Sequence, residues 1–260
     1  MTIRIKAPIL PNKEYLMLYK SYLDKIQEIL DKAISTQGAA IEQAAKLTAA
    51  SIAGGGLLHV FGCGHSQMYA MELFYRAGGL VPVNAILTPA LALAPCAPLS
   101  TFGERIPGLA DVILKNEPVK AGDTLLIAST SARNNVPVEM AIGAKKMGVN
   151  VILLYSSEFA NSVSSRHSSG KNAGEYADVV IDSCGVSGDA VMSLEGVEAK
   201  FGATSSVIGF AMLQAVIVQT VEFLVQQGHK PQVWVSSNLE QGDAINRSYI
   251  EKYKTVITNL

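Results

Sequence analysis

The sequence predicts an α/β protein, a three-layer αβα sandwich built on a five-stranded parallel sheet, with a helical extension at the N-terminus. Two observations lead to this class. Five short apolar runs have the length of buried strands, and helical patterns of roughly 10–15 residues separate them, as in βαβ units. The chain has 260 residues, 49% of them hydrophobic, which suits one large domain with its own core better than two equal domains.

The N-terminal extension is expected to be a pair of amphipathic helices within residues 13–53. Apolar and aromatic side chains from Tyr15 to Leu30 recur near i, i+3, i+4 and i+7, and Gln37-Gly38 interrupts the pattern. We expect residues 1–53 to pack on the domain and to contribute to an oligomer interface. Residues 54–228 then form the α/β domain, and residues 229–260 form a C-terminal tail.

The elements of the domain follow from short apolar runs and from helical periodicity. A buried strand is expected at 57–61, and the helix after it runs from Ser66 to Gly78-Gly79. Residues 88–120 are less regular, with a short helical piece around 109–114. The polar, Ser-rich segment 156–171 is expected to be a loop or a short helix. The remaining expected elements are strands at 81–87, 123–128, 149–155 and 178–182 and helices at 137–147 and 205–227.

Charge and composition argue against several kinds of partner and cofactor. The formal net charge is −1 and charged residues make up 17%, which gives no electrostatic footprint for nucleic acid. Cys63, Cys96 and Cys184 stand far apart without a CxxC spacing, so we expect reduced thiols in a reducing compartment. The four histidines form no HxxxH pair, so we expect no metal site, and we expect no cofactor.

Membrane insertion is not expected either. The apolar stretch 207–225 contains Gln214, Gln219 and Glu222, which favours a buried core or interface helix over a membrane span. Two prolines interrupt any hydrophobic segment of a signal peptide near the N-terminus. These features predict a cytoplasmic protein.

Two loops at the carboxyl ends of expected strands carry residues suited to an anionic ligand. Ligands of open parallel sheets bind outside these strand ends. Residues 61–66 include Gly64, which permits a tight turn, and Ser66, which can cap the next helix. Residues 129–135 offer three hydroxyls and backbone N–H groups at a helix N-terminus, as a phosphate requires. Alternatively Ser129–Ser131 only cap that helix, but two such loops at neighbouring strand ends favour a binding site.

Neither loop matches the common nucleotide-binding motifs. Gly62 and Gly64 supply a G-x-G, but Gln67 replaces the third glycine of G-x-G-x-x-G, and no acidic residue follows about 20 residues later. The chain also has no G-K-[ST] sequence of the P-loop kind. A nucleotide is therefore the weaker interpretation of these loops.

The two loops together resemble those of the sugar isomerase (SIS) domain. The pattern Phe-Gly-x-Gly-x-Ser after the first strand and Ser-x-Ser-x-x-Asn after a later one lies at residues 61–66 and 129–134. The family includes phosphoheptose isomerase, arabinose-5-phosphate isomerase, the isomerase half of glucosamine-6-phosphate synthase and N-acetylmuramic acid 6-phosphate etherase. Stretches such as 72–80 and 165–171 resemble a separate branch related to phosphoheptose isomerase. The resemblance implies a flavodoxin-like three-layer fold and a phosphosugar ligand, without specifying a reaction.

The resemblance also implies which residues bind the phosphate. Ser129, Thr130, Ser131 and Asn134 would surround it, together with the backbone N–H groups of residues 130–134. Asn134 departs from the family, which usually has Ser or Thr there, but an amide can still donate two hydrogen bonds.

Further residues are implied near the sugar. Ser66 matches the sugar-binding serine of the family, and Gly64 beside it allows close approach of the backbone. The Thr-Ser-Ser sequence that includes Ser205 resembles the Thr/Ser cluster that SIS proteins have near the sugar, at the start of their last domain helix. Lys200 can pair with a phosphate or a hydroxyl, although it can equally be a surface charge.

Three residues are candidates for proton transfer, which in sugar-phosphate chemistry is carried by a Glu or a His. They are Glu72 on the helix after the first loop, His65 in that loop, and His167 in the polar segment after the fourth strand. Each is alternatively an ordinary helix or loop residue. Phosphoheptose isomerases have their catalytic Glu four residues further on, where this chain has Arg76, and a catalytic His on the helix that corresponds to 205–227, where it has none.

We therefore expect a protein that binds a phosphorylated sugar or amino sugar and catalyses aldose–ketose isomerisation or a related proton abstraction. A non-catalytic phosphosugar sensor and a phosphosugar lyase or etherase are the alternatives. The expected partners are the phosphorylated sugar and further copies of the chain, as a homodimer or tetramer, because exposed apolar helix faces usually find a partner.

Overall fold

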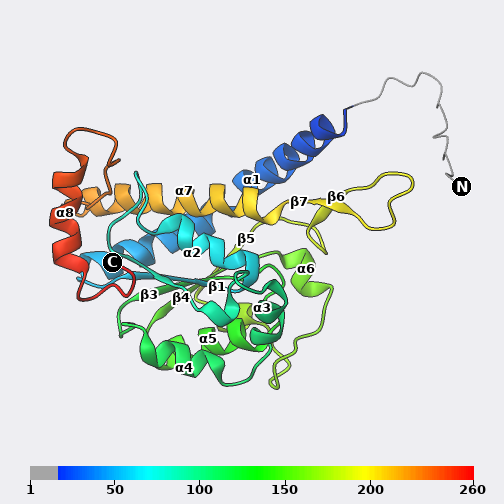
Figure 1. The fold of residues 1–260 in the computed structure, drawn as a ribbon, viewed down its shortest axis with the longest axis horizontal. Coiled ribbons are helices and arrows are strands. Elements are labelled where there is room, and N and C mark those ends of the chain that lie inside the picture. The colour runs from blue at the N-terminus through cyan, green and yellow to red at the C-terminus, as the bar shows by residue number, and fades with distance from the viewer. Residues whose placement is uncertain (1–16) are drawn as a thin grey trace, which may run out of the picture.

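Figure 1 shows the computed structural model, which describes residues 17–260. Its centre is a five-stranded parallel sheet with the strand order β2-β1-β3-β4-β5. The predicted fold class and the predicted number of strands are confirmed. The strands are β1 (Leu58–Gly62), β2 (Val83–Ile86), β3 (Thr124–Ala128), β4 (Asn150–Tyr155) and β5 (Val179–Asp182).

The register brings the carboxyl ends of β1 and β3 to the same level. Gly62, the last residue of β1, pairs with Ala128, the last residue of β3. Because β1 also pairs with β2 on its other side, the direction in which strands are added to the sheet reverses between β1 and β3. Ligands of open α/β sheets bind at such a switch point. The loops after β1 and β3 are therefore the two that are best placed for a ligand.

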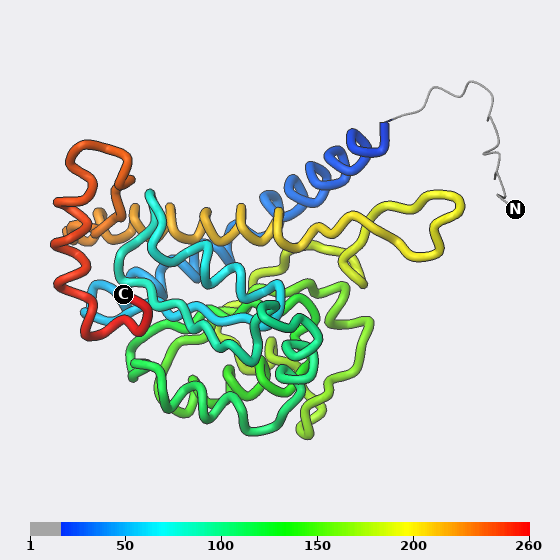
Figure 2. Tube along the Cα trace, viewed as in Figure 1, coloured from blue at the N-terminus to red at the C-terminus, as the bar shows by residue number. Residues whose placement is uncertain are grey.

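Alternating strand residues pack into two hydrophobic cores, one on each face of the sheet. Leu58 and Val60 of β1 belong to one core, and Phe61 belongs to the other. The first core is closed by α1 (Leu18–Ala53), α2 (Gln67–Leu73) and α7 (Ser205–Gln226), and the second by α4 (Leu109–Asn116) and α5 (Asn135–Lys146). The same three layers can be followed along the chain trace in Figure 2.

The N-terminal extension is one continuous helix, α1, so the prediction of two helices within residues 13–53 is wrong for the residues from 17 onward. Residues 13–16 lie outside the described part of the chain. Gly38 lies inside α1, where a glycine costs about 1 kcal/mol relative to alanine. Buried side chains on both sides of it, such as Ala33 and Ala44, pack α1 against β5 and α7 and outweigh that cost.

Helix α7 is apolar enough to resemble a membrane span. Among the described residues it is the one helix that is long and apolar enough to cross a membrane, with a mean hydropathy of 1.8 over 18 residues. Within that window 44% is buried, and α7 packs along α1 and α2. A core helix passes the same test, so its composition is weak evidence for a membrane.

The C-terminal residues, expected to be a tail, contain the helix α8 (Gly242–Tyr253). Asn246 anchors it, because its side chain accepts a hydrogen bond from the Val235 N–H (3.0 Å) and donates one to the Val235 C=O (2.7 Å). The Tyr249 ring also packs edge-on against Trp234, with centroids 5.9 Å apart. These contacts with distant residues stabilise a helix whose own sequence is mostly polar.

Other boundaries differ from the prediction for local reasons. The helix after β1 ends at Leu73 instead of Gly78, because Phe74 is extended and Tyr75 has a φ of 46°. The Ser-rich segment after β4 contains the short helix α6 (Ser157–Asn161). A small antiparallel hairpin, β6 (Ala190–Met192) with β7 (Phe201–Ala203), and the helix α3 (Ala97–Gly103) were not expected.

Candidate functional site

The loop after β1 is a compact turn that presents Ser66. Cys63 is extended, and residues Gly64–Ser66 form a single 3-10 turn that leads into α2. Gly64 has a φ of 58°, a conformation that glycine adopts without strain. A Cβ at Gly62 would collide with the backbone of Ser66. Glycine at these two positions therefore allows the chain to fold back over the end of β1.

The loop after β3 is held by backbone hydrogen bonds to its neighbours. The Ser129 N–H donates to the Leu154 C=O (3.0 Å), and the Thr130 C=O accepts from the Ser156 N–H (2.9 Å). Ala132 has a φ of 53°, and its C=O accepts from the Ala173 N–H (3.0 Å). These bonds fix the loop relative to β4 and to the segment before β5.

The hydroxyls of this loop do not cap α5. The N-cap residue of α5 is Asn134, and it makes no side-chain capping bond. Within residues 17–260, the hydroxyls of Ser129, Thr130, Ser131 and Ser66 have no hydrogen bond to another protein group. The capping interpretation of Ser129–Ser131 therefore has no support in the structure. Four hydroxyls at the same edge of the sheet are available to a ligand.

The two loops enclose one cleft of about 610 Å³, within the usual range for small-molecule sites. A neighbouring cavity of about 440 Å³ lies between this region and the β6–β7 hairpin. His65, Ser66 and Thr130 line both cavities. Of the candidate residues, the cleft is also lined by Gly64, Ser129, Ser131 and Asn134, and the neighbouring cavity by Lys200 and Ser205.

The Ser205 hydroxyl is already engaged within the protein. It donates to Oδ2 of Asp189 (2.6 Å), while Oδ1 of Asp189 accepts from the N–H of Thr204 (3.0 Å), the hydroxyl of Thr204 (2.9 Å) and the N–H of Ser205 (2.8 Å). The Ser205 C=O accepts from the Tyr69 hydroxyl (2.7 Å). Burial, and secondarily the nearby Asp189 charge, raise the pKa of Tyr69. Asp189 thus joins the hairpin to the start of α7 and forms part of the cavity wall.

Glu72 and His167 line neither cavity. The Glu72 carboxylate pairs with Arg76 and accepts a hydrogen bond from Nε2 of Gln214 on α7 (3.0 Å). His167 Nδ1 lies 2.8 Å from the Ser169 hydroxyl, and its Nε2 lies 4.0 Å from Glu139 on α5. The structure therefore brings His65 to the cleft and leaves the other two candidate proton-transfer residues engaged elsewhere.

Glu104, which the sequence analysis did not single out, lies in the wall of the cleft. It follows α3 in the irregular segment between β2 and β3, where no periodic pattern marks a functional residue. Burial raises the pKa of Glu104. The Asn134 amide and the charges of Arg105 and Arg166 lower it, but burial has the larger effect, so the pKa lies above its ordinary value. Burial and the Glu104 charge hold the pKa of the adjacent Cys63 thiol well above its ordinary value.

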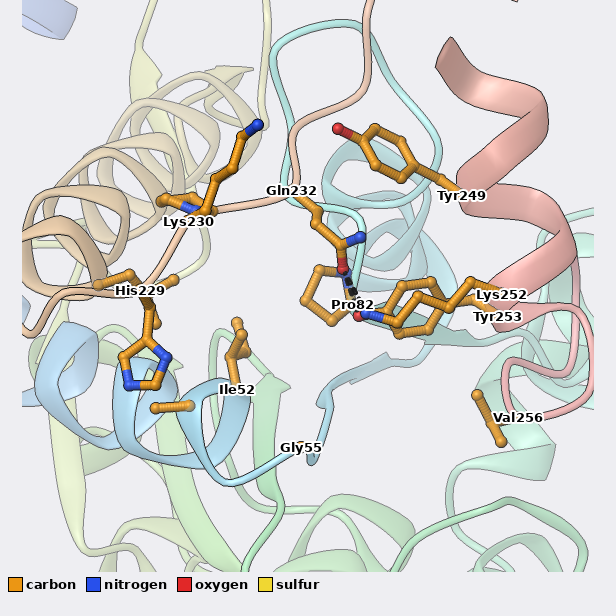
Figure 3. A pocket seen from close by; sticks show the side chains of 13 residues that line it. Ile52, Gly55, Pro82, His229, Lys230, Gln232, Tyr249, Lys252, Tyr253 and Val256 are labelled. Atoms are coloured by element: carbon orange, nitrogen blue, oxygen red, sulfur yellow. Dashed lines mark hydrogen bonds between the residues drawn. The ribbon is translucent and has the colours of Figure 1, made fainter. Parts of the chain in front are cut away.

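A further cavity of about 610 Å³ lies at the opposite edge of the sheet, between the 229–232 segment and α8 (Figure 3). Gly55 precedes β1 and Pro82 precedes β2, so this cavity lies at the amino ends of the strands. Its Gln232 side chain already accepts hydrogen bonds from Lys252 (3.0 Å) and from the Tyr253 hydroxyl (2.7 Å). It lacks the set of free hydroxyls that marks the cleft. Within residues 17–260, no group of three or more His, Cys, Asp or Glu side chains is arranged to hold a metal ion.

A flavodoxin-like sheet with a Gly-rich loop and a Ser-rich loop at its switch point defines a SIS-domain protein, and a family model described as "SIS domain" matches residues 21–156. The chain belongs to this family, and within it to the UPF0309 proteins. A UPF0309 protein of Halalkalibacterium halodurans is 43% identical over 235 residues, covering 90% of this chain and 97% of the relative. One from Caldanaerobacter subterraneus is 40% identical over 242 residues, covering 92% and 98%.

Solved structures resemble the fold at much lower identity. A phosphoheptose isomerase from Francisella tularensis matches with a TM-score of 0.55 and 16% identity, over 81% of this chain and 100% of that one. The phosphoheptose isomerase GmhA of Neisseria gonorrhoeae matches with a TM-score of 0.51 and 15% identity, over 78% and 95%. These similarities support the assignment of the fold.

Proposed function

We propose that the protein binds a phosphorylated sugar or amino sugar in the cleft between the loops after β1 and β3. The observation that carries this proposal is the set of hydroxyls on Ser66 and Ser129–Ser131, which share one cleft and have no hydrogen-bond partner among residues 17–260. The cleft lies before the N-terminus of the 12-residue helix α5. A helix N-terminus favours an anion, and hydroxyls donate to phosphate oxygens.

Membership in the SIS family supports the same ligand class. Two proteins with the same fold are phosphoheptose isomerases by name and act on a phosphorylated sugar. The neighbouring cavity that shares His65, Ser66 and Thr130 leaves room for the sugar beyond its phosphate, with Lys200 in its wall. Ser129, Ser131 and Thr130 would then hold the phosphate, and Ser66 would contact the sugar.

The proposed reaction is aldose–ketose isomerisation or a related abstraction of a proton next to a carbonyl. It needs a general acid–base group within hydrogen-bonding reach of the reacting carbon. His65 lines both cavities, which supports it as a candidate for such a group. Glu72 and His167 do not line either one, so their proposed roles receive no support from position.

The test is a panel of phosphosugars that includes arabinose 5-phosphate, glucosamine 6-phosphate, fructose 6-phosphate and N-acetylmuramic acid 6-phosphate. Thermal shift detects binding, and proton NMR in D2O detects release of a leaving group or loss of the proton next to the carbonyl, which is on C2 of an aldose and on C1 of fructose 6-phosphate. We expect at least one compound to stabilise the wild-type protein and to exchange this proton. Stabilisation without exchange would identify a sensor, elimination would identify a lyase, and no stabilisation by any compound would contradict the proposed ligand class.

We also propose that copies of the chain associate. Exposed apolar side chains occur along α7, where Val218 is 69% exposed, and along α1, where Ile34 is 66% exposed. The first turns of α1 and the β6–β7 hairpin extend beyond the body of the domain in Figure 1. Apolar faces of this kind mark association surfaces.

A further inference from the structure

Glu104 is fixed relative to the loop after β3, which carries Ser129–Ser131. Its backbone C=O accepts a hydrogen bond from the N–H of Val136 (3.0 Å), in the first turn of α5. The preceding residue, Gly103, is packed so closely that a Cβ there would lie 2.6 Å from the C=O of Ala90. The end of α3 is thus held from two sides, and Glu104 lines the same cleft as Ser66 and Ser131.

Asn134 connects Glu104 to Arg166. Asn134 is 6% exposed, and its Oδ1 accepts a hydrogen bond from Nη1 of Arg166 (2.7 Å). Because the amide oxygen is hydrogen-bonded to the guanidinium, the amide nitrogen is the atom left to face the Glu104 carboxylate, whose charged form it favours.

The charges around Glu104 come from several elements. Arg105 follows it in the chain, Arg166 reaches in from the segment after α6, and the Cys63 thiol faces it from the loop after β1. Burial disfavours the carboxylate, whereas the two guanidinium groups and the Asn134 amide favour it. The result is a partly buried carboxylate that is kept available for accepting a proton.

We propose that Glu104 is the group that removes the proton next to the substrate carbonyl, and that Asn134 and Arg166 position it. This rests on the proposed function of the cleft. The Glu104 carboxylate takes the proton, the C–H electron pair forms the C=C bond of an enediolate, and the carbonyl oxygen receives the displaced electron pair. In an isomerisation the hydroxyl on the carbon that lost its proton passes the hydroxyl proton through water to the former carbonyl oxygen. Protonated Glu104 then returns its proton to the former carbonyl carbon.

This assignment gives a different role to Asn134 from the one its sequence position implies. Asn134 acts through Glu104 and is a positioning residue, while the phosphate is left to the hydroxyls of Ser129, Thr130 and Ser131. The substitution of Asn for the usual hydroxyl residue then has a physical reason, because an amide accepts from Arg166 through its oxygen and can donate towards Glu104 through a separate nitrogen.

The first experiment compares Glu104→Gln with Glu251→Gln, an exposed position on α8, using a panel compound that wild type binds and exchanges. We expect Glu104→Gln to bind the compound within about threefold of wild type and to lose exchange of the proton next to the carbonyl by about a hundredfold or more, the usual range for an acid–base group. Glu251→Gln should exchange normally. Exchange by Glu104→Gln at the wild-type rate would overturn the proposal, and urea unfolding of both variants checks that they are folded.

The second experiment needs no substrate. The carboxyl of Glu104 is titrated by carbon NMR in the full-length protein, with its signal assigned by its loss in Glu104→Gln. We expect a pKa above the ordinary value for Glu and a further rise in Asn134→Ala and Arg166→Gln, because each removes a group that favours the carboxylate. An ordinary pKa, unchanged in both variants, would contradict the positioning arrangement.

The two experiments separate the two proposals. If no panel compound binds wild type, the proposed function fails and the catalytic role of Glu104 fails with it. If wild type binds and exchanges a compound while Glu104→Gln exchanges it equally well, the ligand class stands and only the role of Glu104 is wrong. The pH profile of exchange in Asn134→Ala should shift to higher pH, which a purely structural Asn134 would not cause.

Discussion

Nε2 of His59 lies 2.9 Å from Oδ2 of Asp123, and neither side chain has any exposed surface. His59 belongs to β1 and Asp123 precedes β3, so the pair joins two neighbouring strands at the edge opposite the cleft. Asp123 also accepts hydrogen bonds from the backbone N–H groups of Leu57 (3.0 Å) and Lys120 (3.0 Å). On the other side of the ring, Nδ1 of His59 lies 3.2 Å from Nδ2 of Asn84 in β2. The network holds the strands whose carboxyl ends carry the candidate site.

The first prediction concerns Asp123→Asn. The substitution leaves donors without their charged acceptor in a buried network, so we expect the free energy of unfolding to fall by about 3 kcal/mol at pH 7, measured by urea unfolding. Asp24→Asn on the exposed side of α1 is the matched control and should change little. Equal stability of the two variants would mean that the network contributes nothing measurable.

The same pair gives a pH dependence. Burial alone raises the pKa of Asp123, but hydrogen bonds from His59, Leu57 and Lys120 outweigh it, so the pKa lies below its ordinary value. The stabilisation is therefore present above the ordinary pKa of Asp and is lost as the pH falls below it. We expect the difference between wild type and Asp123→Asn to shrink on acidification from pH 7 towards pH 3.

The second prediction concerns the loop after β3, the proposed phosphate site. Ser129→Ala and Ser131→Ala each remove a hydroxyl without a hydrogen-bond partner in the described part of the chain, so stability should stay within about 0.5 kcal/mol of wild type. A hydrogen bond to a charged group contributes about 1.5–3 kcal/mol, so each variant should bind a stabilising phosphosugar about tenfold to a hundredfold more weakly. Calorimetric titration measures this, with Ser168→Ala in an exposed segment as the control. Unchanged affinity in both loop variants would exclude this loop as the phosphate site.

The sheet and the two loops could be read from the sequence because their signals are local. Leu58, Val60 and Phe61 form an apolar run interrupted only by His59, since both faces of β1 are buried. Gly62 and Gly64 mark the turn after β1, and the hydroxyls of Ser129–Ser131 mark the loop after β3. Each of these features depends on residues within a few positions of one another.

What the sequence did not reveal depends on contacts between distant residues. Glu104 is placed by Val136 and by the Asn134–Arg166 pair, and no spacing within residues 88–120 encodes that. Gly38 suggests a break in α1 that packing against α7 prevents. The β6–β7 strands have three residues each, too few to show an alternating pattern, and they are held by Asp189.

The third prediction concerns Asp189→Asn. Asp189 has a φ of 58°, which Asn tolerates, so the substitution keeps the backbone, removes the charge and replaces one accepting oxygen by an NH2 group. Its carboxylate accepts four hydrogen bonds from Thr204 and Ser205, and we expect a loss of about 1–3 kcal/mol in the free energy of unfolding. Asp243→Asn, in an exposed position on α8, is the control. Hydrogen exchange should also increase around residues 201–206, and unchanged exchange there would argue against this role.

The fourth prediction concerns association. We expect light scattering to give the mass of a dimer or tetramer at micromolar concentration. Val218→Glu places a charge in the middle of the exposed apolar face of α7 and should shift the distribution towards monomer. Val256→Glu changes a side chain that is 45% exposed but lies beyond α8, and it should have no effect. A monomeric wild-type protein would contradict the prediction.

The fifth prediction uses Cys63 as a reporter of the cleft. Burial, together with the Glu104 charge, raises the pKa of its thiol well above the ordinary value, so little thiolate exists at pH 8. Cys96 is exposed, and we expect iodoacetamide to modify it at least about tenfold faster, as measured by peptide mass spectrometry. Glu104→Gln removes a charge that disfavours the thiolate, so it should speed the reaction of Cys63 and leave that of Cys96 unchanged. If Cys63 reacts as fast as Cys96, or does not respond to Glu104→Gln, the two side chains do not lie close together in the cleft, as the assignment of Glu104 requires.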